Sequence, residues 1–465
     1  MQTPKWLFNC LKCLECSGVE FADRAESIQC ISCKEEYRVS NHAIFLIKKS
    51  TMIDAAEIIS QHLNGIEPSA IEKVFATALR YRLNDETLRG EFSGILERYS
   101  NVLARHETES SEIRTPEAGS RLEKLIDYFN PVFEAGQDCH RSIRVRNQSD
   151  EVIETTGQTP FHLSYWLRSP DGTLIEGARS RFPIPLLPGC DLTVPLKIAV
   201  PREPGEYELD VKLVQEFIAW EEKSLLSKTI TVKEPGEPRS SLVTPPHNGY
   251  FDFKEDIARS GKVLGDAISM AFERLGDERR SVQILEMACG HEPMSLRYYR
   301  PSTHVVACDL AFPQVQLGAL MFEKINRLAF ENSVFIAADM FNLPLRPKSF
   351  DVVVISAALH HFTDIVEALQ LMSDLLRPGG SIVLLREPGK YSPDDPTYIK
   401  ELMNGFNEQQ FEVGEYDIMF ERSGLKLAYE QLDFECSYKA ILQHSEYQAI
   451  ESGEKKFSNP GVATR

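Results

Sequence analysis

Hydrophobic and polar positions follow three different patterns along this chain of 465 residues. Between residues 51 and 135, apolar side chains mostly recur at three- and four-residue spacing, which predicts a helical segment. Between residues 136 and 236, apolar and polar side chains alternate, which is typical of short strands with one buried face. From residue 249 to 465, short apolar runs alternate with amphipathic stretches, and this order predicts an α/β fold.

Turn residues separate the segments of the alternating region. Pro170-Asp171-Gly172, Pro188-Gly189 and Pro204-Gly205 stand between its apolar–polar stretches. Several short strands joined by such turns predict an antiparallel β-sandwich over residues 136–236. Prolines from Pro235 to Pro246 then mark a linker to the α/β part.

The α/β part has a regular order of expected elements. Strands are predicted at 282–287, 304–308, 333–337, 350–355 and 381–385, and helices at 253–275, 313–330 and 364–376. Strands that alternate with helices pair in parallel, and the helices cover both faces of the sheet. The expected fold class is therefore α/β, Rossmann-like and doubly wound, with ligands at the carboxyl ends of the strands.

Composition restricts the classes of function. A formal net charge of -18 argues against a broad surface for nucleic acid or anionic membrane, so we expect no nucleic-acid partner. No apolar run approaches the length that crosses a bilayer, so no membrane insertion is expected. The N-terminus lacks the pattern of a signal peptide, and a cytoplasmic location is the expectation.

The cysteines are unevenly distributed. Five of the ten lie in the first 33 residues, namely Cys10, Cys13, Cys16, Cys30 and Cys33. In a reducing compartment, C-x-x-C pairs indicate metal ligands, and two pairs can hold one tetrahedral Zn²⁺. Cys13 and Cys16 with Cys30 and Cys33 are favoured over a set that uses Cys10, because Gly18 follows Cys16 where a tight loop is needed. Four thiolates leave no open position, so the zinc over residues 1–50 should be structural.

Candidate chemistry begins at the end of the first α/β strand. Leu285-Glu286-Met287-Ala288-Cys289-Gly290 is a strand that runs into a turn of small residues, and Asp309 ends the next strand. Such a turn lets the backbone approach a nucleoside, and the second carboxylate can bind ribose hydroxyls. An acid at Glu286 favours a cationic nucleoside over a pyrophosphate. S-adenosylmethionine (SAM) has that character, because it carries an ammonium and a sulfonium group.

Residues 250–435 resemble the class I SAM-dependent methyltransferases of the type 11-like group. The first strand and turn, Asp309, Asp339-Met340, Leu359-His360-His361-Phe362 and Arg377-Pro378-Gly379-Gly380 stand in that family's order. The resemblance implies that eight residues bind SAM: Glu286, Ala288, Gly290, Asp309, Leu310, Asp339, Met340 and Ala357. Within this set, Asp309 would hold the ribose, Asp339 the adenine amino group, and Ala357 would face the methyl donor.

A hydroxyl acceptor must lose its proton, and histidine is the usual base. His361 and His360 follow the fourth strand and are the candidate catalytic residues, with His291 and Glu387 on comparable loops. Glu292 stands where the family has a third glycine, so a degenerate module that binds SAM without catalysis is the alternative.

Two further resemblances concern the N-terminal half. Residues 1–50 resemble the zinc ribbon of tRNA-methyltransferase activators and of some small-molecule methyltransferases, with Tyr37-Arg38-Val39 after the second cysteine pair. Leu163-Ser164-Tyr165-Trp166, Arg181-Phe182-Pro183 and the stretch from Pro204 to Trp220 resemble the glycan-binding domain of O-antigen ABC transporters. A partner protein could bind through the ribbon or the sandwich.

The sequence therefore predicts a SAM-dependent methyltransferase that acts on a small molecule or a glycan intermediate, as in surface polysaccharide biosynthesis. Methylation of a quinone or another small molecule is one alternative. A non-catalytic assembly protein that binds SAM or a glycan is the other.

Overall fold

The computed structural model describes residues 6–24, 27–40, 43–45, 120–236, 241–243, 252–276, 281–392, 395–403, 406–434 and 436–444. The helices expected between residues 51 and 119 lie outside these ranges. None of the helices in the described ranges is both long and apolar enough to cross a membrane.

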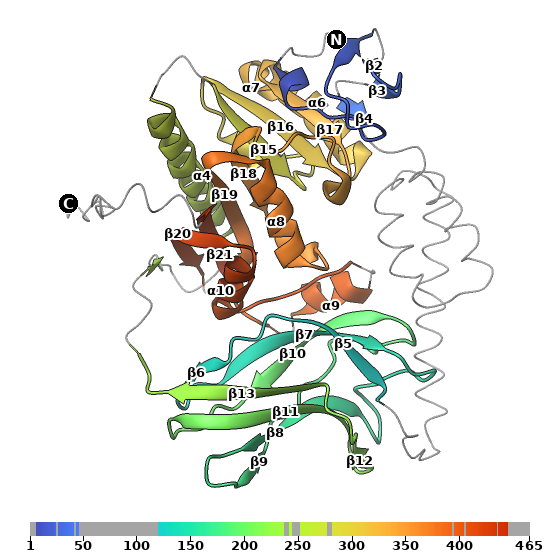
Figure 1. The fold of residues 1–465 in the computed structure, drawn as a ribbon, viewed down its shortest axis with the longest axis vertical. Helices are drawn as coiled ribbons and strands as arrows, with labels where there is room; N and C mark the ends of the chain where they lie inside the picture. The colour runs from blue at the N-terminus through green and yellow to red at the C-terminus, as the bar shows by residue number, and fades with distance from the viewer. Residues whose placement is uncertain are drawn as a thin grey trace.

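A twelve-stranded sheet forms the upper part of the molecule in Figure 1, in the order β1-β2-β3-β4-β17-β16-β15-β18-β19-β21-β20-β14. Its central strands are parallel: β15 (Val282–Met287), β16 (Thr303–Asp309), β17 (Ser333–Ala337), β18 (Phe350–Ser356) and β19 (Leu376–Pro388). Beyond them lie β20 (Leu425–Asp433), β21 (Ser437–His444) and β14 (Leu242–Val243). β16 and β17 lie on one side of β15, and β18 and β19 lie on the other. The strand order therefore reverses between β15 and β18, which makes this the topological switch point.

Helices cover both faces of this sheet, because its strands are apolar on both sides. One face packs on α4 (Phe253–Leu275), α6 (Phe312–Ile325) and α7 (Arg327–Glu331). The other packs on α8 (Ile365–Leu375) and α10 (Val413–Arg422). The shorter elements are α5 (Met294–Arg297), α9 (Pro396–Met403) and the 3-10 turns η1 (Leu7–Asn9), η2 (Met340–Asn342) and η3 (Leu359–His361).

The helix expected over 313–330 is two helices. Asn326 ends α6, and its side chain accepts a hydrogen bond from the amide of Ala329 at the start of α7. An N-cap residue can end one helix and begin another while the apolar pattern continues, so α6 and α7 still bury the same face.

The N-terminal module is part of the sheet. Its strands are β1 (Phe21–Asp23), β2 (Ser27–Cys30), β3 (Glu36–Ser40) and β4 (Ala43–Phe45). The first three pairs are antiparallel, and β4 then pairs in parallel with β17, with Ile44 opposite Ile336. The sequence predicted a separate ribbon, whereas the structure has a ribbon whose strand β4 lies between β3 and β17 and so continues the α/β sheet.

Arg346 fixes this module to the loop after η2. Its guanidinium donates to the carbonyls of Leu11 at 2.7 Å and Phe8 at 2.9 Å, and also to that of Val19. The backbone around it continues the contact, because the Arg346 amide donates to the Cys10 carbonyl at 2.7 Å. The Trp6 indole stacks on the His304 ring with 4.7 Å between ring centres.

The middle of the chain forms two further sheets that share one apolar core. The three-stranded sheet contains β5 (Leu122–Asp127), β7 (Cys139–Asn147) and β10 (Asp191–Ile198). The six-stranded sheet contains β6 (Val132–Glu134), β8 (Phe161–Arg168), β9 (Leu174–Glu176), β11 (Gly205–Gln215), β12 (Ala219–Trp220) and β13 (Leu226–Lys233). We call residues 120–236 the β-region. Its pairs are antiparallel except that of β6 with β13.

The helical prediction was wrong for residues 120–135, which form β5 and β6. Leu122, Leu125, Ile126 and Phe129 fit a helical spacing, which explains the error. A bulge between Lys124 and Ile126 lets the same residues pair with β7 instead, so the long-range pairing overrides the local pattern.

The β-region contacts the α/β unit through its three-stranded sheet. The amide of Ser142 donates to the buried carboxylate of Glu415 at 2.6 Å, and the His140 ring lies 3.0 Å from Glu412. Tyr398 and Leu402 of α9 belong to the apolar core of the β-region. Figure 1 shows α9 between the two units.

Candidate functional site

Strained backbone marks the carboxyl edge of the central strands. Ala288 after β15 has φ +49°, and Ala357 after β18 has φ +50°. In β19, Arg386 has φ +60°. A left-handed conformation costs a residue other than glycine about 1–2 kcal/mol, and such residues gather at functional sites. Three such residues lie on or directly after the adjacent strands β15, β18 and β19, which indicates that the functional site is at the edge next to the β15–β18 switch point.

Glu286 ends β15 and is almost fully buried. Its two carboxylate oxygens accept the amides of Met294 and Ser295, each at 2.7 Å, and the Ser295 hydroxyl also donates to it. Burial raises the pKa of Glu286 to about 7, although these hydrogen bonds act in the opposite direction. The structure therefore places this carboxylate against the first two residues of α5.

Asp309 ends the neighbouring strand β16. One of its oxygens accepts the Gly290 amide at 2.8 Å and the other accepts the Ala311 amide at 2.8 Å. Burial raises the pKa of Asp309 above its ordinary value. The carboxylate thus joins the turn after β15 to the loop of Leu310 and Ala311, at the level of Gly290, which itself has φ +56°.

Asp339 follows β17 and caps η2. It accepts the Phe341 amide and the Asn342 side-chain amide, both at 3.0 Å. Met340 beside it is 9% exposed. The amide of Ala338 donates to the carbonyl of Asp309 at 2.9 Å, so the ends of β16 and β17 are tied together. Glu286, Asp309 and Asp339 therefore end three adjacent strands along one edge.

His360 lies in η3 and is held by a buried carboxylate. Glu387 accepts the amides of Ala358 and Leu359 at 3.0 Å and that of His360 at 3.1 Å, and it lies 2.7 Å from His360 Nδ1. Burial acts to lower the pKa of His360, but the Glu387 charge outweighs it and raises that pKa. Glu387, which the sequence offered as an alternative base, orients the imidazole.

His361 is the more exposed histidine of the pair, with 40% of its side chain open to solvent. Its Nδ1 lies 3.2 Å from Glu408 Oε2, and His360 Nε2 lies 3.5 Å from Glu408 Oε1. Sequence reasoning missed Glu408, since it stands in a polar stretch without a recognisable pattern. The remaining candidate base, His291, faces Gln314 Oε1 at 2.9 Å on the exposed side of the turn.

The cysteine cluster has the geometry of a tetrahedral site. The ligand atoms of Cys13, Cys16, Cys30 and Cys33 all lie within 4.8 Å of one another, with Sγ–Sγ distances of 3.5 Å for Cys13–Cys33 and 3.7 Å for Cys16–Cys30. Zn–S bonds of about 2.3 Å at tetrahedral angles place sulfurs about 3.8 Å apart. Cys10 instead points to the Trp6 carbonyl, which excludes the other pairing.

Gly18 has the role that the sequence assigned to it. A Cβ at this position would lie 3.1 Å from Cys16 Sγ and 3.2 Å from Cys30 Sγ. Any side chain would therefore press on the cluster, so the glycine permits the close loop after the first cysteine pair.

Comparison with known proteins agrees with this geometry. Residues 285–384 match a family model described as a methyltransferase domain, the span from the end of β15 through most of β19. The C-terminal part of the chain thus contains a class I SAM-dependent methyltransferase domain.

Individual relatives resemble the same part of the chain. Demethylmenaquinone methyltransferase of Streptomyces griseus is 28% identical over 174 residues, which are 36% of this chain and 72% of that protein. Its counterpart in Beutenbergia cavernae is 31% identical over 157 residues, which are 32% of this chain and 61% of that protein. The ubiquinone/menaquinone biosynthesis C-methyltransferase UbiE of Hahella chejuensis is 28% identical over 142 residues, 28% and 56%. The chain thus spans less than two thirds of the last two relatives.

Among solved structures, the mitomycin 7-O-methyltransferase MmcR aligns with a TM-score of 0.32 and 14% identity, over 41% of this chain and 54% of that one. The magnesium protoporphyrin IX methyltransferase ChlM of Synechocystis aligns with a TM-score of 0.32 and 15% identity, over 43% and 90%.

Proposed function

We propose that this protein transfers the methyl group of SAM to a small molecule at the carboxyl edge of β15–β19. The observation that carries the proposal is the row of Glu286, Asp309 and Asp339 at the ends of three adjacent strands, all within the segment that matches the methyltransferase domain. Carboxylates along one edge favour a donor that carries positive charge.

The chain mainly has to bring two reactants into line. SAM supplies a methyl group that its sulfonium already activates. Asp309 binds the ribose by exchanging its bond from the Gly290 amide for ribose hydroxyls, and Asp339 accepts from the adenine amino group. Holding the reactants in one geometry and excluding water supplies most of the rate increase for such a displacement.

His361 is the proposed base for an acceptor proton. It is the exposed member of the histidine pair and lies four residues beyond Ala357, at the mouth of the switch point. His360 is buried and held by Glu387, so its proposed part is to position the loop.

Calorimetry with SAM tests the proposal. We expect micromolar binding to the full-length protein and at least a tenfold weaker affinity in Asp309→Ala, because a charge-assisted hydrogen bond contributes about 1.5–3 kcal/mol. Asp374→Asn on the exposed side of α8 is the matched control and should bind like the wild type. Absence of heat in the wild type would contradict the proposal and favour an assembly protein that keeps the α/β domain as a scaffold only.

A quinol is the first acceptor class to examine. Its support is that the relatives include proteins named as demethylmenaquinone methyltransferases. Transfer of labelled methyl from SAM to a panel of quinols and of nucleotide-linked sugars separates this class from the glycan intermediates. Label in the sugars alone would reject the quinol.

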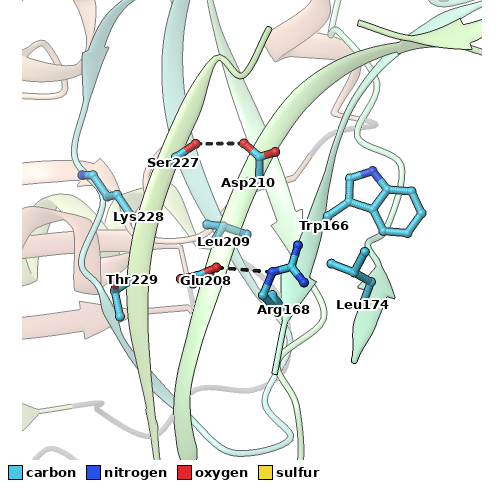
Figure 2. Close-up of a pocket in the computed structure, with 9 residues that line it drawn as sticks. All are labelled: Trp166, Arg168, Leu174, Glu208, Leu209, Asp210, Ser227, Lys228 and Thr229. Atoms are coloured by element: carbon cyan, nitrogen blue, oxygen red, sulfur yellow. Dashed lines mark hydrogen bonds and ion pairs between the residues drawn. The ribbon is translucent and has the colours of Figure 1, made fainter. Parts of the chain in front are cut away.

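A glycan contact rests on a groove of about 500 Å³ on the six-stranded sheet, lined in part by Trp166, Arg168, Glu208 and Asp210 (Figure 2). An aromatic face beside polar groups is suited to a sugar ring. Figure 1 shows this sheet on the side of the β-region away from the α/β unit, so a bound glycan would be held apart from His361. A glycan array on the full-length protein and on Trp166→Ala tests the contact, and a blank array with both would reject it.

We also propose that the four-cysteine cluster binds structural zinc. Its support is the set of sulfur distances and the short strands around it, which bury little apolar surface by themselves. Metal analysis should find one zinc per chain, and its loss in Cys30→Ser would identify the cluster as the site.

A further inference from the structure

Two imidazoles and one carboxylate converge at the mouth of the proposed methyl-transfer site. The ligand atoms of His360, His361 and Glu408 lie within 4.8 Å of one another. His361 Nδ1 lies 3.2 Å from Glu408 Oε2, and His360 Nε2 lies 3.5 Å from Glu408 Oε1. Donor atoms about 2.1 Å from a shared metal ion are about 3.0–3.5 Å apart, so the spacing suits coordination.

The position of Glu408 is fixed by the residues on either side of it. The side-chain amide of Asn407 donates to the carbonyl of His361 at 2.9 Å. The side-chain amide of Gln409 donates to the carbonyl of His360 at 2.9 Å and to that of Phe362 at 2.8 Å. Glu408 is therefore held against the histidine loop by its neighbours, without using its own carboxylate.

The β-region orients these two amides. Arg144 of β7 donates to Asn407 Oδ1 at 2.8 Å, and the Thr193 hydroxyl of β10 donates to Gln409 Oε1 at 2.6 Å. Because each amide oxygen is bound by the β-region, each amide nitrogen is directed at the histidine loop. The Glu408 carboxylate thus lies beside the two histidines at the contact between the β-region and the α/β unit.

His360 has the partner that a metal-binding histidine usually has. Glu387 lies 2.7 Å from its Nδ1, which leaves Nε2 facing Glu408. Metal-bound histidines generally donate their second ring N–H to a carboxylate or carbonyl, which fixes the tautomer and the orientation of the ring. The 40% exposure of the His361 side chain leaves one side of the trio open to solvent.

We propose that His360, His361 and Glu408 bind one divalent transition-metal ion, with an open position toward the methyl acceptor. Two imidazoles and one carboxylate suit Zn²⁺, Fe²⁺ or Co²⁺, and three protein ligands with an open position are typical of catalytic metal sites. The proposal rests on the proposed methyl transfer and specifies its acceptor as a hydroxylated aromatic or enolic small molecule.

With the ion bound, His361 would be a ligand and no longer the base, and the ion would act on the hydroxyl of this acceptor in its place. A hydroxyl on a divalent ion loses its proton to solvent more readily, because the positive charge lowers its pKa. An electron pair of the resulting anion, on oxygen or on a conjugated carbon, forms the bond to the methyl carbon. The pair of the broken S–CH₃ bond stays on sulfur. On the carbon path, the methylated carbon then loses its proton and the acceptor oxygen takes one back from solvent, so either path releases one proton in total.

Metal stoichiometry of the full-length protein tests the site. The protein is stripped with a chelator, loaded with Co²⁺, and weighed by native mass spectrometry. We expect two ions in the wild type, one at the four-cysteine cluster and one at the trio, and one ion in both Glu408→Gln and His361→Gln. Glu401→Gln on α9 is the matched control and should keep two, because its carboxylate is not part of the trio.

Cobalt absorption assigns each ion, since only the thiolate cluster gives strong sulfur-to-metal charge-transfer bands. The proposal is overturned if the wild type binds one ion, or if Glu408→Gln and His361→Gln bind as many ions as the wild type with the same affinity. SAM calorimetry is independent of this result: loss of the second ion with normal SAM binding supports the metal site, and absent SAM binding removes methyl transfer alone.

Discussion

Substitution of Arg346 tests how the cysteine module is attached to the α/β sheet. Arg346→Ala removes the side chain that donates to the carbonyls of Phe8, Leu11 and Val19. Arg346→Lys keeps the charge but replaces a planar fork of donors by one ammonium group. We therefore expect a graded series, in which Lys is intermediate between Arg and Ala.

The magnitude follows from the three bonds. A hydrogen bond from a charged donor contributes about 1.5–3 kcal/mol. Arg346 is partly exposed, so water replaces some of the lost interaction, and the bonds share one side chain and are not additive. We expect local opening of the module to become easier by about 2–4 kcal/mol, which corresponds to about 30- to 1000-fold faster exchange of protected amides.

Hydrogen exchange by mass spectrometry on the zinc-saturated protein measures this change. The informative amides are that of Lys12, which donates to the Pro344 carbonyl at 2.9 Å, and those of β4 along β17. Arg327→Ala is the control, because that side chain is 79% exposed and its ion pair with Glu331 contributes little. Unchanged exchange at Lys12 and β4 in Arg346→Ala would refute the reasoning.

Three further predictions concern the cluster, the site and the contact between units. Removal of zinc by a chelator should expose residues 6–40 to proteolysis while the β-region stays protected, which limited digestion followed by mass spectrometry would detect. Glu286 has a pKa of about 7 in the folded protein, above its ordinary value of 4.5. The folded state thus keeps a proton that the unfolded chain loses, so Glu286 alone should decrease stability by up to about 3 kcal/mol as pH rises from 4.5 to 7. Burial also raises the pKa of Glu415 to about 7, so equilibrium unfolding should show a shallower slope in Glu286→Gln than in the wild type, and equal slopes would contradict this. Thr193→Val should weaken the protection of amides at 406–410 by about 1–3 kcal/mol, because Gln409 Oε1 loses its buried donor, and equal exchange in both proteins would contradict this.

The parallel strands could be predicted because both of their faces are buried. Runs such as Val352-Val353-Val354-Ile355 need no partner information to be recognised as interior strands. The clustering of Cys13, Cys16, Cys30 and Cys33 was also predictable, because a Cβ on Gly18 would lie 3.1–3.2 Å from the sulfurs of Cys16 and Cys30. In both cases a local physical constraint determined the result.

The rest depended on long-range contacts that a local pattern does not contain. β4 is three residues long, and nothing in Ala43-Ile44-Phe45 specifies pairing with β17, almost 300 residues further on. Residues 122–127 fit a helix equally well until β7 is present. Glu408 lies 47 positions beyond His361, and only the amides on either side bring it to the histidines.

The parallel pairing of β4 with β17 has a practical consequence for fragments of this protein. A fragment that begins at residue 249 would keep β15 to β21 but would leave the peptide groups of β17 unpaired on the side where β4 lies. It would also lose β14, which lies along β20 at the opposite margin. Two bare margins invite association between copies, so an excised fragment should self-associate more readily than the whole chain.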